Sequence, residues 1–341
     1  MSGVTLRARA PAKLNLCLFL GPTRPDGRHQ LVSVVQSLSL ADELTLAPLA
    51  GPGAVGDPGG GGDRGGGADG GGGEDRGGGE DRVVCPGVQG ENLAGRALRA
   101  FRAATGWGAP AQELRIEKRV PVAAGMGGGS ADAAAALRLA AAAAGVEDPA
   151  LLHGLAAELG ADVPAQLTPG RALTTGAGER VRRLAFGGGS TGGGEGAPGM
   201  GVLILGAAEA LFTPAVYAEA DRLGLPRDAA GLRDPLGAVE AAVADGEREL
   251  PLELMVNELE PAARSLCPAL DGALEAARGA GADVALVCGS GPTVAGLFLG
   301  PGGPAAAEAA RAALADRRPA PLVARPVGAD FAAVSTMRHN G

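Results

Sequence analysis

Four glycines within five residues stand between a candidate strand and a candidate helix, and this arrangement could bind a phosphate. The stretch reads Pro121-Val122-Ala123-Ala124-Gly125-Met126-Gly127-Gly128-Gly129-Ser130-Ala131. Glycine lets a backbone approach a ligand where a Cβ would clash. The first N–H groups of a helix and its positive dipole end attract anions. Residues 113–120 alternate like a strand and residues 133–144 predict a helix, so the sequence predicts a built phosphate loop.

Three common phosphate loops are excluded by residue type. A P-loop needs a lysine after its glycines, and none follows here. A dinucleotide fingerprint needs a glycine where Ser130 stands, which argues against an oxidoreductase. The later motifs of a protein kinase are also missing. The segment resembles instead the phosphate loop of the GHMP small-molecule kinases.

Four further blocks extend this resemblance in the expected order. They read Ala-Pro-Ala-Lys-Leu-Asn-Leu-Cys-Leu at 10–18 with Arg-Pro-Asp-Gly-Arg-His at 24–29, Leu-Gly-Ala-Asp-Val-Pro at 159–164, and Cys-Gly-Ser-Gly-Pro-Thr at 288–293. They are similar to the GHMP kinases that act on a cytidine diphosphate-linked methylerythritol in the non-mevalonate isoprenoid pathway. The likeness runs from about Val4 to Gly328.

The resemblance implies an α+β fold of two domains. An N-terminal ATP-binding domain at 1–169 would be like the second domain of ribosomal protein S5. A C-terminal domain at 170–341 would be ferredoxin-like, with the active site in the cleft between them. Mixed strand and helix order suits such layered domains.

Composition restricts the alternatives. The 341 residues are 46% hydrophobic but only 2% aromatic, so Ala, Val and Leu must build the core. A net charge of −8 argues against nucleic acid as a partner. No apolar run has the length of a membrane span, and the four scattered cysteines fit small core residues in a reducing, cytoplasmic setting. Both a monomer and a homodimer remain open.

Glycine-rich tracts at 51–82 and 187–201 interrupt the resemblance. They offer no hydrophobic face to bury, and we expect flexible, solvated insertions. The stretches 43–46 and 82–85 on either side of the first tract predict the two strands of a hairpin.

The remaining pattern predicts alternating helices and strands. Helices are expected at 92–105, 151–159, 214–224, 235–245, 252–264, 268–279 and 304–316, and strands at 202–205, 283–287, 293–299 and 322–326.

Asp162 and Lys13 are the candidate catalytic residues. From the residues alone, Asp162 after Gly160 suits an N-cap or a solvated loop as well as a base. Lys13 lies among apolar strand residues and needs a carboxylate or phosphate partner if buried, although an edge position would also explain it. The resemblance implies that Asp162 takes the proton of the acceptor hydroxyl and that Lys13 steadies its charge.

Substrate recognition is expected to involve Asn15, Arg28, His29 and Tyr217. The resemblance implies that His29 hydrogen-bonds a cytosine. This sequence departs from the family in carrying Arg28 where relatives have a stacking tyrosine. A guanidinium can also stack on a flat base. Tyr217, the chain's only tyrosine, would take the other face.

Four further features belong to the expected nucleotide end of the site. The Ser130 hydroxyl could cap the helix, touch a phosphate or hold Mg²⁺. Asn92 faces the adenine side by analogy, and the turn Gly289-Ser290-Gly291 offers N–H groups to the transferred phosphate. Ala124, where many relatives have glycine, requires a negative φ.

The function implied is ATP-dependent, Mg²⁺-assisted phosphorylation of the 2-hydroxyl of the cytidine diphosphate-linked substrate. Two alternatives remain open from the sequence. One is another GHMP kinase, acting on homoserine, mevalonate or a sugar. The other is a non-catalytic nucleotide-binding relative.

Overall fold

Two β-sheets organise the protein, whose computed structural model describes residues 4–49, 80–88, 90–185, 199–244 and 250–337. In the seven-stranded sheet the order is β11–β1–β2–β4–β3, with β5 on β2 and β6 on β5. Its strands are β1 (Thr5–Thr23), β2 (His29–Pro48), β3 (Arg82–Val84), β4 (Gln112–Glu117), β5 (Arg171–Gly176), β6 (Arg180–Arg183) and β11 (Ser335–Met337). The four-stranded sheet, ordered β10–β7–β9–β8, contains β7 (Gly201–Leu205), β8 (Val284–Val287), β9 (Val294–Phe298) and β10 (Leu322–Ala324).

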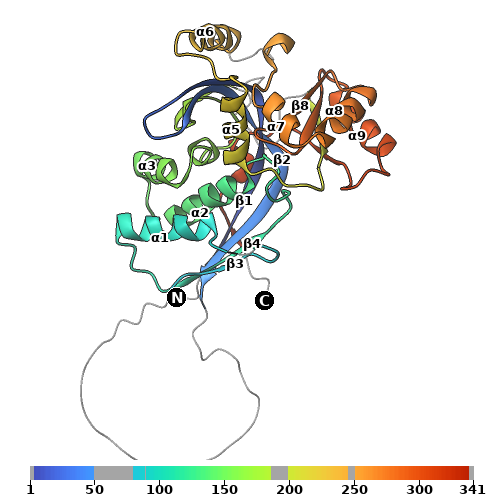
Figure 1. Cartoon of the computed structure of the whole chain (residues 1–341). Coiled ribbons are helices and arrows are strands. Elements are labelled where there is room, and N and C mark those ends of the chain that lie inside the picture. The colour runs from blue at the N-terminus through green and yellow to red at the C-terminus, as the bar shows by residue number, and fades with distance from the viewer. Residues whose placement is uncertain (1–3, 50–79, 89, 186–198, 245–249, 338–341) are drawn as a thin grey trace, which may run out of the picture.

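Helices cover both sheets (Figure 1). The first group, which lies with the larger sheet, contains α1 (Leu93–Thr105), α2 (Gly128–Ala144), α3 (Pro149–Leu159) and the single turn α4 (Val163–Gln166). The second group contains α5 (Thr213–Arg222), α6 (Arg233–Ala242), α7 (Glu260–Leu266), α8 (Ala269–Gly279) and α9 (Gly303–Ala313), with 3₁₀ turns at η1 (Leu252–Leu254) and η2 (Ala329–Ala332). Of these, α8 and α9 pack on β9 and β7. No helix in the described part of the chain is both long and apolar enough to cross a membrane.

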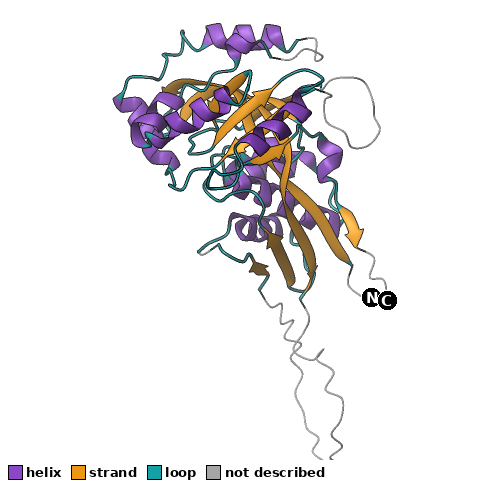
Figure 2. Cartoon of the chain, turned by 90° about the vertical axis from the view of Figure 1, so that its right-hand side faces the viewer, coloured by secondary structure: helices purple, strands orange, loops and turns teal. Residues whose placement is uncertain are grey.

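The long strands β1 and β2 run side by side through the seven-stranded sheet (Figure 2). They pair antiparallel from Leu6 opposite Leu46 to Thr23 opposite His29. Along β1, Ala10, Leu16 and Leu20 each enter a different hydrophobic cluster. One strand therefore connects all three cores, and the side chains between them are held at defined positions.

Alanine builds much of the core around α2. Ala133 to Ala136 are fully buried there, and Ala94 and Ala97 of α1 are buried in the same cluster. Small side chains let the two helices lie close together, and leucines fill the remaining volume. The expected core of Ala, Val and Leu is confirmed. Among the cysteines, Cys17, Cys267 and Cys288 are buried thiols and Cys85 is half-buried.

Two expected elements are wrong. The strand at 82–85 does not form a hairpin with β2: β3 pairs parallel with β4, which lies between them. The helix expected at 252–264 is split, because the chain at Val256 accepts a hydrogen bond from the Leu18 N–H of β1 at 2.7 Å. That tertiary pairing overrides the local helical pattern, and α7 begins only at Glu260. The other predicted helices and strands match observed elements within a few residues, except that α2 begins five residues earlier than expected.

The division into domains at 169/170 stays a prediction. Strands β5 and β6 follow that point and belong to the seven-stranded sheet. Most of both glycine-rich tracts lies outside the described residues, which resume at Glu80 and Gly199.

Candidate active site

A cavity of about 470 Å³ gathers most of the predicted site residues. Its lining includes Lys13, Asn15, Asn92, Pro121, Val122, Ala123, Ala124, Gly125, Gly127, Gly128, Gly129, Ser130, Asp162, Tyr217, Gly289 and Ser290. Of the others, Met126 and Ala131 are buried in the cores. Arg28, His29 and Gly291 are not part of the lining.

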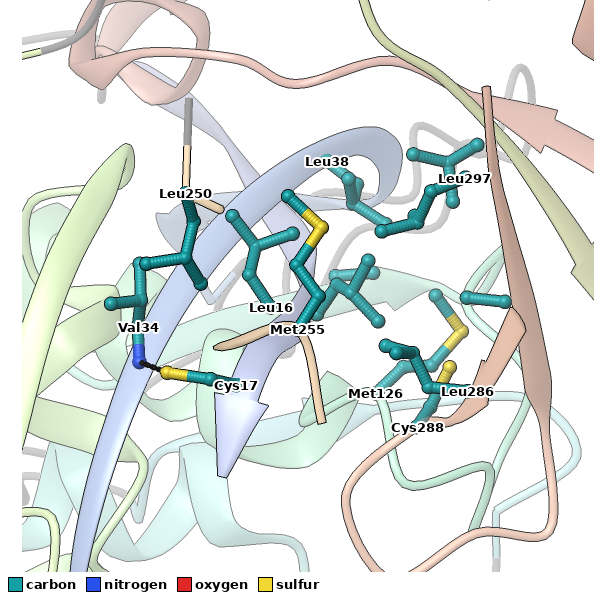
Figure 3. Close-up of a cluster of buried hydrophobic side chains, with 14 of the residues drawn as sticks. Leu16, Cys17, Val34, Leu38, Met126, Leu250, Met255, Leu286, Cys288 and Leu297 are labelled. Atoms are coloured by element: carbon teal, nitrogen blue, oxygen red, sulfur yellow. Dashed lines mark hydrogen bonds between the residues drawn. The ribbon is translucent and has the colours of Figure 1, made fainter. Parts of the chain in front are cut away.

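The phosphate loop lies directly against the turn at 288–291. Gly125 has a φ of 72°, and a Cβ there would stand 2.0 Å from the carbonyl oxygen of Cys288. Only glycine meets both conditions, so this contact explains the residue. Beneath it, Met126 packs with Leu286 and Cys288 (Figure 3). Burial raises the pKa of the Cys288 thiol to about 12, which leaves it an apolar packing residue.

The expected backbone conformation of Ala124 is confirmed, and the residue before it has an unusual one. Ala123, not Ala124, is the residue with a left-handed conformation, at a φ of 56°. Ala124 is buried and is not among the positive-φ residues, which agrees with the expectation for this position.

Helix α2 begins at the cavity, within the phosphate loop. Its N-cap is Gly127, which offers no side chain to bond the first turn. The capping interpretation of Ser130 is therefore wrong, because that residue already lies inside the first turn. The first N–H groups of a helix have no intrahelical partner. The residues of this first turn, Gly128, Gly129 and Ser130, all line the same cavity.

Lys13 and Asp162 meet in this cavity from distant parts of the chain. The Lys13 Nζ lies 3.5 Å from Asp162 Oδ2, and the side chains are 6% and 48% exposed. Asp162 precedes α4, yet its carboxylate makes no capping bond to that helix. The ammonium is nearly buried, whereas the carboxylate beside it is half-exposed and remains accessible to a ligand.

A chain of hydrogen bonds fixes the Lys13 ammonium. Lys13 Nζ donates to Asn15 Oδ1 at 2.7 Å, and Asn15 Nδ2 donates to Ser33 Oγ at 2.8 Å. Lys13 also packs on the loop, where its Cγ lies 2.9 Å from the position of a Cβ on Gly127. Because both groups of the Asn15 amide are used within the protein, Asn15 orients Lys13 in this structure.

The turn at 289–291 is held by a residue that sequence reasoning missed. Asn257 Nδ2 donates to the carbonyl oxygen of Gly289 at 2.7 Å. Ser290 Oγ lies 2.9 Å from Thr213 Oγ1 at the start of α5. These contacts connect the turn to the segment that precedes α7 and to the start of α5. No local motif marks Asn257, which lies where a helix was expected.

Among the expected substrate residues, Tyr217 and His29 lie together, whereas Arg28 lies apart from the cavity lining. Tyr217 lines the cavity, and burial together with the Asp162 charge raises the pKa of its hydroxyl. The His29 ring lies 5.1 Å from the Tyr217 ring, centroid to centroid. Arg28 is half-exposed in the β1–β2 connection, where its Nε lies 4.0 Å from Asp26. A stacking role for Arg28 stays a prediction.

The nucleotide end contains a buried charge cluster that the sequence did not reveal. Lys118 Nζ donates to Asp132 Oδ2 at 2.8 Å and to Asp42 Oδ2 at 2.5 Å. Its Nζ lies 3.4 Å from the position of a Cβ on Gly128, so the ammonium stands beside the phosphate loop. Lys13 and Lys118 are the only lysines among 30 Lys and Arg residues, and both line this cavity. The rarity of lysine is therefore the feature of the sequence that could have singled out Lys118.

Asn92 has an observed structural role at the same end. Its side chain caps α1 by accepting a hydrogen bond from Ala94 N at 2.9 Å. It also lines the cavity, so contact with an adenine stays a prediction.

The donor set at the cavity fits a Mg²⁺ ion that is shared with a nucleotide. Mg²⁺ in such sites takes one or two protein oxygens and completes its shell with phosphates and water. The Ser130 hydroxyl is an oxygen donor at the phosphate loop. The described residues contain no group of three or more His, Cys, Asp or Glu able to hold a metal by themselves.

Comparisons with known proteins agree with this geometry. The models of the GHMP kinases N-terminal domain and of the GHMP kinases C-terminal domain match residues 92–170 and 238–320. A protein of Streptomyces coelicolor named 4-diphosphocytidyl-2-C-methyl-D-erythritol kinase is 39% identical, with 86% of this chain and 88% of the relative covered. One of the same name from Kineococcus radiotolerans is 40% identical, with 87% and 82% covered.

Solved structures show the same relationship. The crystal structure of a 4-(cytidine 5′-diphospho)-2C-methyl-D-erythritol kinase is 30% identical with a TM-score of 0.65, and the match covers 94% of this chain and 99% of that one. A homoserine kinase from Cytophaga hutchinsonii has the same TM-score at 17% identity, covers 99% of this chain and 98% of its own, and shows the shared fold. The chain belongs to the 4-diphosphocytidyl-2-C-methyl-D-erythritol kinase family, a group of ATP-dependent small-molecule kinases within the GHMP kinases.

Proposed function

We propose that this protein phosphorylates the 2-hydroxyl of 4-diphosphocytidyl-2-C-methyl-D-erythritol with ATP, giving the 2-phosphate and ADP. This reaction belongs to the non-mevalonate isoprenoid pathway. The observation that carries the proposal is the Lys13–Asp162 pair, at 3.5 Å, in one cavity with a phosphate loop, in a chain of this family.

Asp162 acts as the general base in this proposal. Its carboxylate accepts the proton of the 2-hydroxyl while that oxygen forms a bond to the γ-phosphorus of ATP. The bond from that phosphorus to the bridging oxygen breaks, and ADP leaves with the electron pair. Lys13 stabilises the negative charge of Asp162 and the charge that develops on the oxygen of the 2-hydroxyl. Its position is fixed through Asn15.

The loop at 121–131 holds the phosphates of ATP. Backbone N–H groups at the start of α2 and the positive end of the helix dipole supply attraction without a side chain. Lys118 adds a positive charge beside Gly128, the role that a P-loop gives to a lysine in the loop itself. When bound, Mg²⁺ neutralises charge on the phosphates, and Ser130 is the residue that would hold it.

The test is ADP release by the purified protein with Mg-ATP. The cytidine diphosphate substrate is offered in parallel with homoserine and mevalonate, and the phosphate ester is identified by mass spectrometry. Turnover on the cytidine compound alone supports the proposal. Activity only on another alcohol would retain the Asp162 chemistry and overturn the substrate. ATP binding without any turnover would indicate a non-catalytic relative.

A further inference from the structure

Helix α5 holds His29 by two residues one helical turn apart. The Tyr217 ring lies beside the His29 ring, and Asp221 Oδ1 lies 2.7 Å from His29 Nε2. Residues at i and i+4 share one face of a helix, so a single face of α5 makes both contacts. We call these two residues the α5 clasp. The His29 side chain is only 6% exposed, whereas that of Asp221 is 49% exposed.

The clasp fixes which nitrogen of His29 carries a proton. An ionised carboxylate only accepts hydrogen bonds, so Nε2 must be the donor to Asp221. Thr23 Oγ1 lies 3.1 Å from the same nitrogen, at the position of β1 opposite His29. Both contacts therefore involve Nε2. The tautomer of a neutral histidine follows from the hydrogen bond that one of its nitrogens makes. With the proton on Nε2, the neutral His29 ring has Nδ1 as an acceptor.

An acceptor distinguishes cytosine from uracil. Cytosine carries an amino group that donates hydrogen bonds, whereas the ring position that matches it in uracil carries a carbonyl oxygen that only accepts. When Nδ1 of His29 is an acceptor, it can accept a hydrogen bond from the amino group of cytosine, whereas it repels the carbonyl oxygen of uracil. The ring is connected to the active-site cavity through Tyr217, which lines that cavity and contacts His29.

We propose that Asp221 is a specificity-determining positioning residue, which holds His29 in the tautomer and orientation that accept a hydrogen bond from a cytosine. This inference rests on the proposed function, because it concerns the base of that substrate. A contact to a half-exposed carboxylate contributes little to stability by itself. The importance of the hydrogen bond from His29 to Asp221 lies in the buried ring that it orients.

The experiment measures dissociation constants of cytidine 5′-diphosphate and uridine 5′-diphosphate by calorimetry. The variants are Asp221→Ala and Asp221→Asn. The control is Glu219→Gln, which removes a charge from the same helix at a residue bonded to Arg222 and Ser265. We expect Asp221→Ala to weaken binding of the cytidine compound about tenfold, the effect of losing a hydrogen bond to a charged group. Binding of the uridine compound should change less, so the ratio of the two constants falls.

Steady-state kinetics provides the second readout. We expect a raised KM for the cytidine substrate in Asp221→Ala, a smaller rise in Asp221→Asn, and unchanged kcat and KM for ATP in both. The Asn variant keeps the size of the side chain and an accepting oxygen, so it remains informative if the Ala variant does not fold. Glu219→Gln should behave like the wild type in both measurements.

The possible outcomes separate the two proposals. An unchanged preference for cytidine in Asp221→Ala overturns the role of Asp221 and leaves the proposed function intact. Tighter binding of cytidine in that variant also overturns it, because Asp221 would then compete with the base. A wild-type protein without any preference for the cytidine compound would overturn the cytidine substrate and this inference together.

Discussion

At the scale of single residues, the two members of the proposed catalytic pair differ in their exposure to solvent. Lys13 is almost fully buried and donates to Asn15, so its position is fixed before any ligand arrives. Asp162 is half-exposed and lies on a turn, where it can meet a hydroxyl. This asymmetry supports the proposed roles, in which the lysine supplies a fixed charge and the aspartate takes the proton.

Asp162→Asn is the direct test of that assignment. The amide keeps the shape of the side chain but cannot take a proton, so kcat should fall by about 10²–10⁴. ATP affinity and unfolding temperature should stay close to wild type, because the phosphate loop is untouched. Asp148→Asn is a matched control: it changes the cap of α3 to a residue that caps equally well. Wild-type turnover in Asp162→Asn would remove this residue from the mechanism.

Sequence reasoning named Lys13 and Asp162, which the structure brings together at 3.5 Å, but it did not find the cluster beside them. Lys13 and Asp162 stand in motifs that the family shares, so their types and order sufficed to name them. Asp42, Lys118 and Asp132 lie outside the motif positions used, and only the folded chain brings them together. Within the described residues, Asp132 Oδ1 is buried with no hydrogen-bond partner.

The cluster predicts a pH-dependent stability. Burial, with the nearby charge of Asp42, outweighs the attraction of Lys118 and raises the pKa of Asp132 from 3.8 to about 7. The folded protein therefore binds more protons than the unfolded chain between those values. The stability that comes from this proton uptake is fully present below pH 4 and is lost as the pH rises through 7. The free energy of unfolding should fall by about 1.4 kcal/mol for each pKa unit that separates the two states.

Urea unfolding at pH 5.5 and pH 8.5 measures this dependence. In Asp132→Asn the side chain cannot ionise, so its stability should change much less between the two pH values. Asp228→Asn, at a residue whose side chain accepts a hydrogen bond from the local Gly231 N–H, should keep the wild-type dependence. An equal pH dependence in Asp132→Asn and the wild type would contradict the assignment of this titration to Asp132.

At the scale of elements, the site depends on how closely two loops approach. The phosphate loop and the turn at 288–291 come from the two sheets, and Gly125 is where their backbones meet. The alanine-rich helix, the preceding strand and the later turn were all predictable from local patterns. Their contact was not, because no local pattern encodes which carbonyl a glycine must accommodate.

Gly125→Ala should separate the two loops. A left-handed alanine costs about 1–2 kcal/mol, and its Cβ would overlap the Cys288 carbonyl unless the backbone moves. We expect a lower unfolding temperature together with weaker ATP binding. Gly154→Ala is the control, because nothing lies within 4 Å of its Cβ position in α3. That control should gain about 0.5–1 kcal/mol. Unchanged ATP affinity in Gly125→Ala would show that the contact does not position the loop.

At the scale of the whole molecule, long strands let distant segments build one cavity. β1 carries Lys13 and Asn15 and crosses all three hydrophobic clusters, while β2 pairs with β1, β4 and β5. The resemblance gave the α+β class and the two-layered order. The parallel pairing of β3 with β4 was missed, because a glycine-rich tract between two strands carries no information about register.

That pairing leads to a prediction for the tract at 51–82. Pro48 stands opposite Gln112 and Arg82 opposite Glu113, so the two ends flank β4, roughly 10 Å apart at two strand spacings. Replacing residues 51–78 by four glycines leaves a connection of about nine residues, which can span roughly 30 Å. The shortened connection therefore reaches without strain, and Asp81 keeps its ion pair with Arg102.

The shortened protein should fold and should have the same kinase activity as the full chain. Loop closure costs less for a shorter connection, so the free energy of unfolding should rise by about 1 kcal/mol. The site residues named above all lie outside 51–78, so kcat and both KM values should match the full-length protein. Replacing residues 80–82 as well provides the contrasting variant, because it removes Asp81 and the first residue of β3. A loss of turnover on shortening 51–78 alone would mean that the tract contributes to catalysis, and that it is more than a tolerated insertion.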